Sequence, residues 1–248
     1  MSVKSSTANK VLDILLLFDE ARPEISGEAI SAAIKTPRST TYRYIRTLTD
    51  KGFLEKVVDG KYCLGPIFFQ FGNLIYGEKT LSYIALPVMQ SIMQQTNETV
   101  LLTRRFNRYS VCMERVEGQQ AIRITFKRGH SQPLYAGAYS KILLAFAGET
   151  FLNDYLEQPL EPFTENTITD PEALRAHLQQ IRKQGFCTSE GEVDIGAKAV
   201  AVPILNSRQR LVAGLTTAGP TFRMDEDTIE HHLQLLLDGA AEIALKLP

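Results

Sequence analysis

The sequence predicts an α+β protein in which a small unit of three helices and a β-hairpin precedes a larger unit with an antiparallel sheet. A basic helix pattern at residues 37–48 and an Asp-Gly pair between two apolar runs predict the first unit. Alternating apolar segments after residue 98 predict the sheet of the second. A chain of 248 residues, 44% hydrophobic and 22% charged, is long enough and of suitable composition for two globular domains.

The first two helices are expected at residues 10–20 and after Ser26. Apolar side chains recur at helical spacing in the first, with charged residues outside the stripe: Val11, Leu12, Ile14, Leu15, Leu16, Leu17 and Phe18 against Lys10, Asp13, Asp19 and Glu20. Ser26 is a good N-cap for the second, because its hydroxyl can accept from a free amide of the first turn. The inward residues of that helix are expected to be Ala29, Ile30, Ala33 and Ile34.

The third helix carries the basic pattern. Thr36 is expected as its N-cap and Pro37 at its first position, where a missing N–H costs nothing. Ile45 and Leu48 share a buried face, and Gly52 follows at the C-cap. The opposite face holds side chains that can reach phosphates and base edges: Arg38, Ser39, Thr40, Thr41, Tyr42, Arg43 and Arg46.

A β-hairpin is expected directly after this helix. Runs 53–58 and 61–64 flank Asp59-Gly60, and Asp-Gly favours a type I′ turn, which needs positive φ at both central residues. Three helices followed by a hairpin form a winged helix-turn-helix, which is a DNA-binding arrangement. Lys56 and Lys61 would lie on the wing near the DNA backbone.

Charge supports DNA binding only after the chain is divided. The whole chain has a formal net charge of −1, which argues against nonspecific binding to nucleic acid. Residues 35–61, however, hold 7 Lys+Arg against 3 Asp+Glu. The positive charge is therefore concentrated on the third helix and the wing, where DNA contacts are expected.

Residues 66–78 are expected to form a linker helix. Its first part is apolar and aromatic, so the helix needs a partner: the neighbouring domains, a second copy of the chain, or both. We expect some contribution to a dimer, since operators are commonly read by dimers. The predicted domains are 1–65, 66–78 and 79–248.

The second domain is predicted from periodicity and turn residues. Helices are expected at 81–95, at 139–146, at 151–156, from Pro171 to a stop at Gly185 with Asp170 as N-cap, and from Asp225 toward Leu245. Strands are expected at 99–103, 110–116, 121–126, 199–205 and 211–218.

The sequence contains no convincing catalytic or metal motif. His231 and His232 are adjacent on one helix, so they point apart and cannot share a metal. Tyr139-Ser140-Lys141 lacks the Ser-x-x-Lys spacing, and Lys141 is expected on a helix surface. An enzyme fused to a winged helix would need a titratable constellation in its pocket, so we expect no enzyme, no metal and no cofactor.

The N-terminal residues contain no signal-peptide core, and no apolar run is long enough to cross a bilayer. Cys63, Cys112 and Cys187 are odd in number and scattered, which is typical of a reducing cytosol. Cys187 is expected to be a small core residue. These observations predict a cytoplasmic protein.

A series of short motifs, in order along nearly the whole chain, resembles the IclR family of transcriptional regulators. They are Tyr62-Cys63-Leu64-Gly65, Asn97-Glu98-Thr99-Val100, residues 129–145, Glu190-Gly191-Glu192, Gly196, residues 199–204 and Ala218-Gly219-Pro220. The resemblance implies a DNA-binding dimer, often a dimer of dimers. It also implies a GAF-like C-terminal domain (79–248) that binds a small effector, frequently an organic or aromatic acid.

By the same resemblance, the effector pocket is lined by segments 133–140, 189–199 and 215–218. The residues expected to bind the effector are Leu134, Gly137, Ala138, Tyr139, Ser140, Ser189, Ala197, Ala199, Thr216 and Ala218. Backbone amides around Ala138 and Tyr139, at a helix start, could cradle an anion on physical grounds alone. Few polar groups suggest a ligand less polar than glyoxylate or pyruvate, although Arg123 and His130 could meet a carboxylate.

Together these features predict a transcriptional regulator, more specifically a repressor, whose operator binding is modulated by a small-molecule effector. Its partners would be double-stranded operator DNA, the effector and further copies of itself, with no membrane. The expected DNA contacts are Pro37, Arg38, Ser39, Thr40, Thr41, Tyr42, Arg43, Arg46 and Lys61. The alternatives are a winged-helix module for protein contacts and a constitutive DNA-binding protein without an effector.

Overall fold

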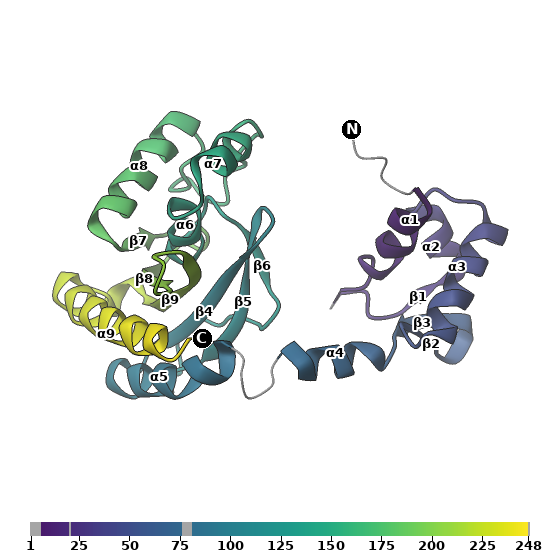
Figure 1. Ribbon diagram of the computed structural model, residues 1–248, viewed down its shortest axis with the longest axis horizontal. Helices are drawn as coiled ribbons and strands as arrows, with labels where there is room; N and C mark the ends of the chain where they lie inside the picture. The colour runs from purple at the N-terminus through teal and green to yellow at the C-terminus, as the bar shows by residue number, and fades with distance from the viewer. Residues whose placement is uncertain (1–5, 20, 76–80, 248) are drawn as a thin grey trace. The chain divides into compact units, whose positions relative to one another are not determined.

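Figure 1 shows the computed structural model, which describes residues 6–19, 21–75 and 81–247. The chain forms two compact units, residues 1–77 and 78–248. Glu20 and the expected end of the linker helix at 76–78 lie outside the described residues. The domain boundaries at 65 and 78, and the role assigned to each domain, stay predictions.

The first unit contains four helices and a small sheet among its described residues. In order they are α1 (Ser6–Leu15), β1 (Ile25–Ser26), α2 (Gly27–Ala33), α3 (Arg38–Asp50), β2 (Leu54–Lys56), the 3₁₀ turn η1 (Val58–Gly60), β3 (Lys61–Leu64) and α4 (Ile67–Ile75). The strands pair antiparallel in the order β1-β3-β2. The core of this unit is formed by Ile14, Ile30, Ile34, Ile45, Leu48 and Leu54.

The helices α1 and α2 bury narrower faces than the sequence predicted. Leu12 lies within α1 on its outer face and is 57% exposed, and Leu16, which follows the end of the helix at Leu15, is 81% exposed; neither joins the apolar stripe. The N-cap prediction for α2 is confirmed, because Ser26 Oγ accepts from Ala29 N at 3.2 Å. Ile30 and Ile34 are buried, but Ala29 and Ala33 are exposed, since a seven-residue helix can bury only one side.

The two ends of α3 differ from each other in how well they were predicted. Pro37 is the N-cap and Thr36 lies outside, with its hydroxyl donating to Ile34 O; the predicted capping by Thr36 is therefore wrong. At the other end Gly52 has a φ of +76°, with Gly52 N donating to Thr49 O and Phe53 N to Leu48 O. These two hydrogen bonds form a Schellman motif, which requires the left-handed glycine.

The wing turn has the predicted backbone conformation, with φ of 63° at Asp59 and 71° at Gly60. The preceding strand β2 ends earlier than expected, at Lys56. Val57 N donates to Lys61 O, so the turn spans Val58 to Gly60.

The second unit is a six-stranded antiparallel sheet covered by helices on both faces. Its elements are α5 (Leu81–Thr96), β4 (Thr99–Phe106), β5 (Tyr109–Val116), β6 (Ser131–Pro133), α6 (Ala138–Ala145), α7 (Glu149–Leu156), α8 (Pro171–Gln184), β7 (Cys187–Glu190), β8 (Ala197–Leu205), β9 (Leu211–Pro220), η2 (Thr221–Arg223) and α9 (Glu226–Leu245). The strand order is β6-β5-β4-β9-β8-β7. In Figure 1, α5 and α9 cover one face, and α6, α7 and α8 cover the other.

The predicted strand at 121–126 does not form, and the sheet takes β6 instead. Side chains, rather than a neighbouring strand, satisfy carbonyls of this segment: Thr99 Oγ1 donates to Ile124 O and Arg223 Nη2 to Ile122 O. The alternating apolar residues Ile124 and Phe126 line a pocket of this unit instead of facing the core from a pleated strand. Cys187 is fully buried in the core beside α6, as predicted. No described helix is both long and apolar enough to cross a membrane.

Candidate DNA interface and ligand pocket

The exposed face of α3 carries most of the predicted DNA contacts. Pro37, Arg38, Ser39, Arg43 and Arg46 are exposed, Thr40 is half-buried, and Lys61 is exposed at the start of β3. Three of the basic side chains make long surface ion pairs, at 3.9 Å from Arg38 to Glu28, 4.0 Å from Arg46 to Asp50 and 4.0 Å from Lys61 to Glu24. Such pairs contribute about 0–1 kcal/mol, so these cations can exchange partners for phosphate at little cost.

Two members of the predicted set have structural roles. Thr41 is fully buried and its hydroxyl donates to Thr36 O at 3.3 Å, so the prediction that it faces DNA is wrong. Its position, four residues before the core residue Ile45, places it on the buried face of the helix. Tyr42 is 39% exposed, and its hydroxyl donates to Glu28 Oε1 at 3.1 Å. Its ring packs on Gly27, where an added Cβ would lie 2.6 Å from the ring.

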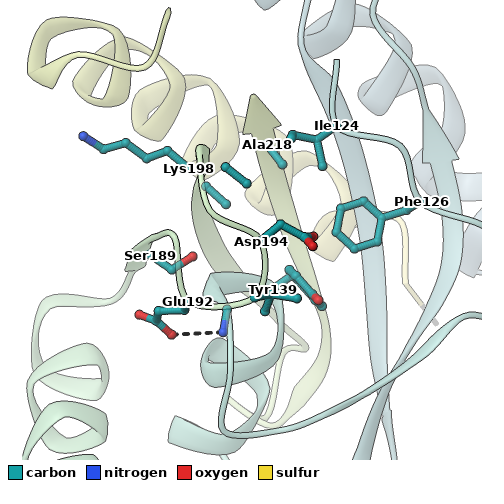
Figure 2. Close-up of a pocket in the computed structure, with 12 residues that line it drawn as sticks. Ile124, Phe126, Tyr139, Ser189, Glu192, Asp194, Lys198 and Ala218 are labelled. Atoms are coloured by element: carbon teal, nitrogen blue, oxygen red, sulfur yellow. Dashed lines mark hydrogen bonds between the residues drawn. The ribbon is translucent and has the colours of Figure 1, made fainter. Parts of the chain in front are cut away.

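A small pocket, about 30 Å³ in volume, lies in the second unit between the start of α6, the loop after β7 and the strands β8 and β9. It contains six of the ten predicted effector residues: Gly137, Tyr139, Ser189, Ala197, Ala199 and Ala218. The other residues that line it are Ile124, Phe126, Glu192, Val193, Asp194 and Lys198. Figure 2 shows residues of the two groups intermixed around the pocket, for example Ser189 beside Glu192 and Ala218 beside Ile124.

The remaining four predicted residues do not line this pocket. Leu134 is fully buried in the core, and the hydroxyl oxygen of Ser140 lies 2.6 Å from that of Ser110. Thr216 is fully buried. Ala138 N donates to Ser189 Oγ at 2.8 Å, so this residue holds the pocket wall together instead of facing a ligand.

The expected anion cradle, formed by the amides around Ala138 and Tyr139 at the start of α6, is partly occupied by the protein itself. Gly137 N donates to Glu192 Oε2 at 3.0 Å, and Ala138 N is bound to Ser189. Lys141 lies beneath, fully buried, with its ammonium 2.5 Å from Glu192 Oε1. The expectation that Lys141 lies on the helix surface is therefore wrong, because this ion pair allows its burial.

Sequence reasoning missed the charged part of the pocket. The loop after β7 was expected to line it, but Glu192, Asp194 and Lys198 were not named, and the pocket was expected to be poor in polar groups. Arg123 does not line the pocket, and its guanidinium bonds to Glu117 at 2.9 Å. His130 is exposed and lies outside the lining.

The pKa is lowered in two histidines, the half-buried His177 and the buried His232. Burial, followed by the charge of Lys141, lowers the pKa of His177, whose Nε2 lies 3.0 Å from that ammonium. Burial, with a smaller contribution from His231, lowers the pKa of His232 to about 4. Among the described residues, no group of three His, Cys, Asp or Glu side chains could hold a metal ion.

Two family models cover most of the chain. One described as the IclR helix-turn-helix domain matches residues 7–57. One described as the bacterial transcriptional regulator IclR C-terminal domain matches residues 77–245. This chain belongs to the IclR family. It is therefore a DNA-binding transcriptional regulator, and its α+β fold is that of IclR regulators.

Individual relatives agree with this assignment. The HTH-type transcriptional regulator KipR of Bacillus subtilis is 29% identical over 248 residues, covering 100% of this chain and 99% of that protein. The transcriptional repressor IclR of Escherichia coli is 23% identical, covering 94% and 87%. The structure of an IclR homologue from Microbacterium hydrocarbonoxydans complexed with 4-hydroxybenzoate is 27% identical with a TM-score of 0.84, covering 98% and 99%. The first is named as a transcriptional regulator, the second as a transcriptional repressor and the third as an IclR homologue.

Proposed function

We propose that this IclR-family regulator is a repressor whose operator binding is modulated by a small molecule bound in the pocket of the second unit. The observation that carries the proposal is α3, whose exposed face presents three arginines while Ile45 and Leu48 anchor the opposite face in the core. The name of the Escherichia coli relative as a repressor supports the direction of regulation. The 4-hydroxybenzoate complex of the Microbacterium homologue supports a small-molecule effector.

The proposed DNA contacts are the predicted set without Thr41. Arg38, Arg43 and Arg46 would bind phosphates or base edges from α3, with Lys61 binding phosphate from the wing. Pro37, Ser39, Thr40 and Tyr42 would set the position of the helix on the duplex. The proposed effector contacts are the six predicted residues that line the pocket.

We propose that the protein acts as a homodimer or a dimer of dimers, with α4 in an interface. One side of α4 packs on its own unit, since Phe68 and Phe71 lie 5.7 and 6.1 Å from Phe53, measured between ring centroids. Phe69 and Leu74 are 75% and 77% exposed, which leaves an apolar surface for a second copy. Since the target would be chromosomal DNA, we propose a cytoplasmic location.

The apolar walls of the pocket suit an aromatic effector. Ile124, Phe126 and Val193 would contact a ring, as the sequence-based prediction of an organic or aromatic acid requires. The polar end of the ligand would be bound by other residues of the pocket, because these three side chains are apolar.

Fluorescence anisotropy on duplexes from upstream of the chain's own and neighbouring genes, across a salt series, tests the proposed function. Site-specific binding whose affinity falls steeply with salt is expected, because phosphate contacts release counterions. Binding insensitive to salt would favour a winged-helix module for protein contacts. Specific binding that no metabolite alters would favour a constitutive DNA-binding protein.

A further inference from the structure

The helix start that could hold a ligand carboxylate is partly filled by the protein's own side chains, which accept from the amides of Gly137 and Ala138. Glu192 Oε2 accepts from Gly137 N and Glu192 Oε1 lies 2.5 Å from Lys141 Nζ, so this carboxylate is held by an amide and an ammonium. A ligand carboxylate bound at this point would lie beside the Glu192 carboxylate. Lys141 would not offset the repulsion between the two carboxylates, because it is already paired with Glu192. The local electrostatics therefore disfavour an acid as the group bound deepest in the pocket.

The charges of the pocket do not balance. Glu192 is neutralised by Lys141. Lys198 contributes to the wall, but its ammonium lies 3.1 Å from Glu190 Oε2 and points away from the pocket in Figure 2. The carboxylate of Asp194 has no hydrogen-bond or ion-pair partner among the residues that the structure describes. Asp194 therefore adds a solvent-exposed negative charge to the wall of the pocket.

A second polar group in the pocket also lacks a partner. Tyr139 is only 6% exposed and lines the pocket, and its hydroxyl has no hydrogen-bond partner among the described residues. A buried hydroxyl without a partner costs about 1–3 kcal/mol, so a ligand that bonds to it removes a penalty. Burial and, next, the charge of Asp194 raise the pKa of Tyr139, which keeps the hydroxyl protonated and able to accept or donate.

The apolar wall shapes the rest of the ligand. The ring of Phe126 meets that of Tyr139 edge to face, with 5.0 Å between centroids, and Ile124 and Val193 extend this surface. In Figure 2 the Asp194 carboxylate lies between Phe126 and Tyr139, at the border between the apolar wall and the polar groups. A ring on the apolar wall would thus carry its polar substituent toward Asp194.

We propose that this pocket takes a small amine: an apolar, preferably aromatic body with a protonated nitrogen held by the Asp194 carboxylate and the Tyr139 hydroxyl. The inference rests on the proposed function for the role of the pocket as an effector site. It replaces the acid of the sequence-based prediction with a ligand of opposite charge. A protonated nitrogen supplies the charge that Asp194 lacks and a donor for the Tyr139 oxygen.

Isothermal titration calorimetry on the full-length protein with probes matched in shape and opposite in charge tests the proposal. The pairs are benzylamine against benzoate, and 4-hydroxybenzylamine against 4-hydroxybenzoate. An amine of either pair is expected to bind at least about tenfold more tightly than its acid, a difference typical of one charge-assisted hydrogen bond. Asp194→Asn should weaken amine binding about tenfold, whereas Asp13→Asn, an equal charge change in the other unit, should leave it unchanged.

Asp194 is exposed in a loop, so its substitution should leave the melting temperature unchanged, and this is checked on the same samples. Tighter binding of the acids, amine binding that Asp194→Asn does not weaken, or no amine binding at millimolar concentration would each overturn the proposal. The DNA assay without ligand separates this failure from failure of the proposed function. An operator complex released by 4-hydroxybenzoate alone would keep the effector-responsive regulator and reject the amine.

Discussion

The ammonium of Lys141 lies 2.5 Å from Glu192 Oε1, with the lysine side chain fully buried and the glutamate 9% exposed. The pair joins the first turn of α6 to the loop after β7, and Glu192 Oε2 adds a bond to Gly137 N. It therefore fixes the loop that carries Asp194 into the pocket. His177 of α8 lies against the same ammonium at 3.0 Å.

Lys141→Met should destabilise the second unit by about 3–5 kcal/mol, because it leaves Glu192 buried without its cation. Urea denaturation followed by circular dichroism measures the loss. The double variant Lys141→Met/Glu192→Leu should recover part of it, since both buried charges are then removed. A single variant as stable as the unaltered protein would show that the pair contributes nothing.

Arg43→Ala should weaken operator binding by about 1–3 kcal/mol while leaving the melting temperature unchanged, because the side chain is exposed on α3. Anisotropy across a salt series measures both affinity and salt slope, and loss of a phosphate contact should reduce the slope by about 1. Arg182→Ala, an exposed arginine of α8 in the other unit, is the matched control. Equal affinities for the two variants would remove Arg43 from the interface.

Local signals in the sequence predicted the helices and the wing well. Ser26 and Asp170 are N-caps as expected, because each side chain accepts from an amide three residues later. The last helix starts near Asp225 as expected, and Asp225 is its N-cap. Gly52 and Gly185 take the left-handed conformation that ends a helix. These features depend on a few adjacent residues, so a sequence pattern is sufficient to find them.

Features that depend on distant residues were missed. Lys141 looked like a surface residue because its partner, Glu192, is 51 residues away. Thr41 is different, because a local signal was overlooked: it lies four residues before the core residue Ile45 and therefore on the buried face of the helix. Residues 121–126 alternate like a strand, yet the tertiary contacts of Thr99 and Arg223 hold them as an irregular segment.

Gly65→Ala should unfold or loosen the first unit. A Cβ on Gly65 would lie 2.2 Å from Gly52 O, and a backbone atom cannot move aside as a flexible side chain can. The expected loss is at least about 1–3 kcal/mol, measured by thermal denaturation, with a parallel loss of operator binding. Gly72→Ala is the control: its Cβ would meet no atom within 4 Å, and alanine should stabilise α4 by up to about 1 kcal/mol. Tolerance of both changes would contradict the close approach of Gly65 to Gly52.

The buried histidine of α9 should make the protein sensitive to acid. His232 is 2% exposed, its Nδ1 lies 3.2 Å from Thr217 Oγ1, and burial lowers its pKa from 6.5 to about 4. Between these values the unfolded chain binds a proton that the folded chain does not, so the free energy of unfolding decreases as pH falls from 6.5 toward 4. The slope from this residue is at most about 1.4 kcal/mol per pH unit. Above pH 6.5 both states are neutral and the effect vanishes.

Urea denaturation at several pH values across this window measures the slope for the unaltered protein and for His232→Gln. The variant should lose part of the slope but not all of it, because the pKa of His177 is also lowered by burial and by Lys141. His231→Gln is the matched control, since His231 is the exposed neighbour on the same helix and should retain most of the slope. A slope that His232→Gln leaves intact would assign the acid sensitivity to His177 or to the carboxylates, and would show that the unfolded and folded states bind protons at His232 equally.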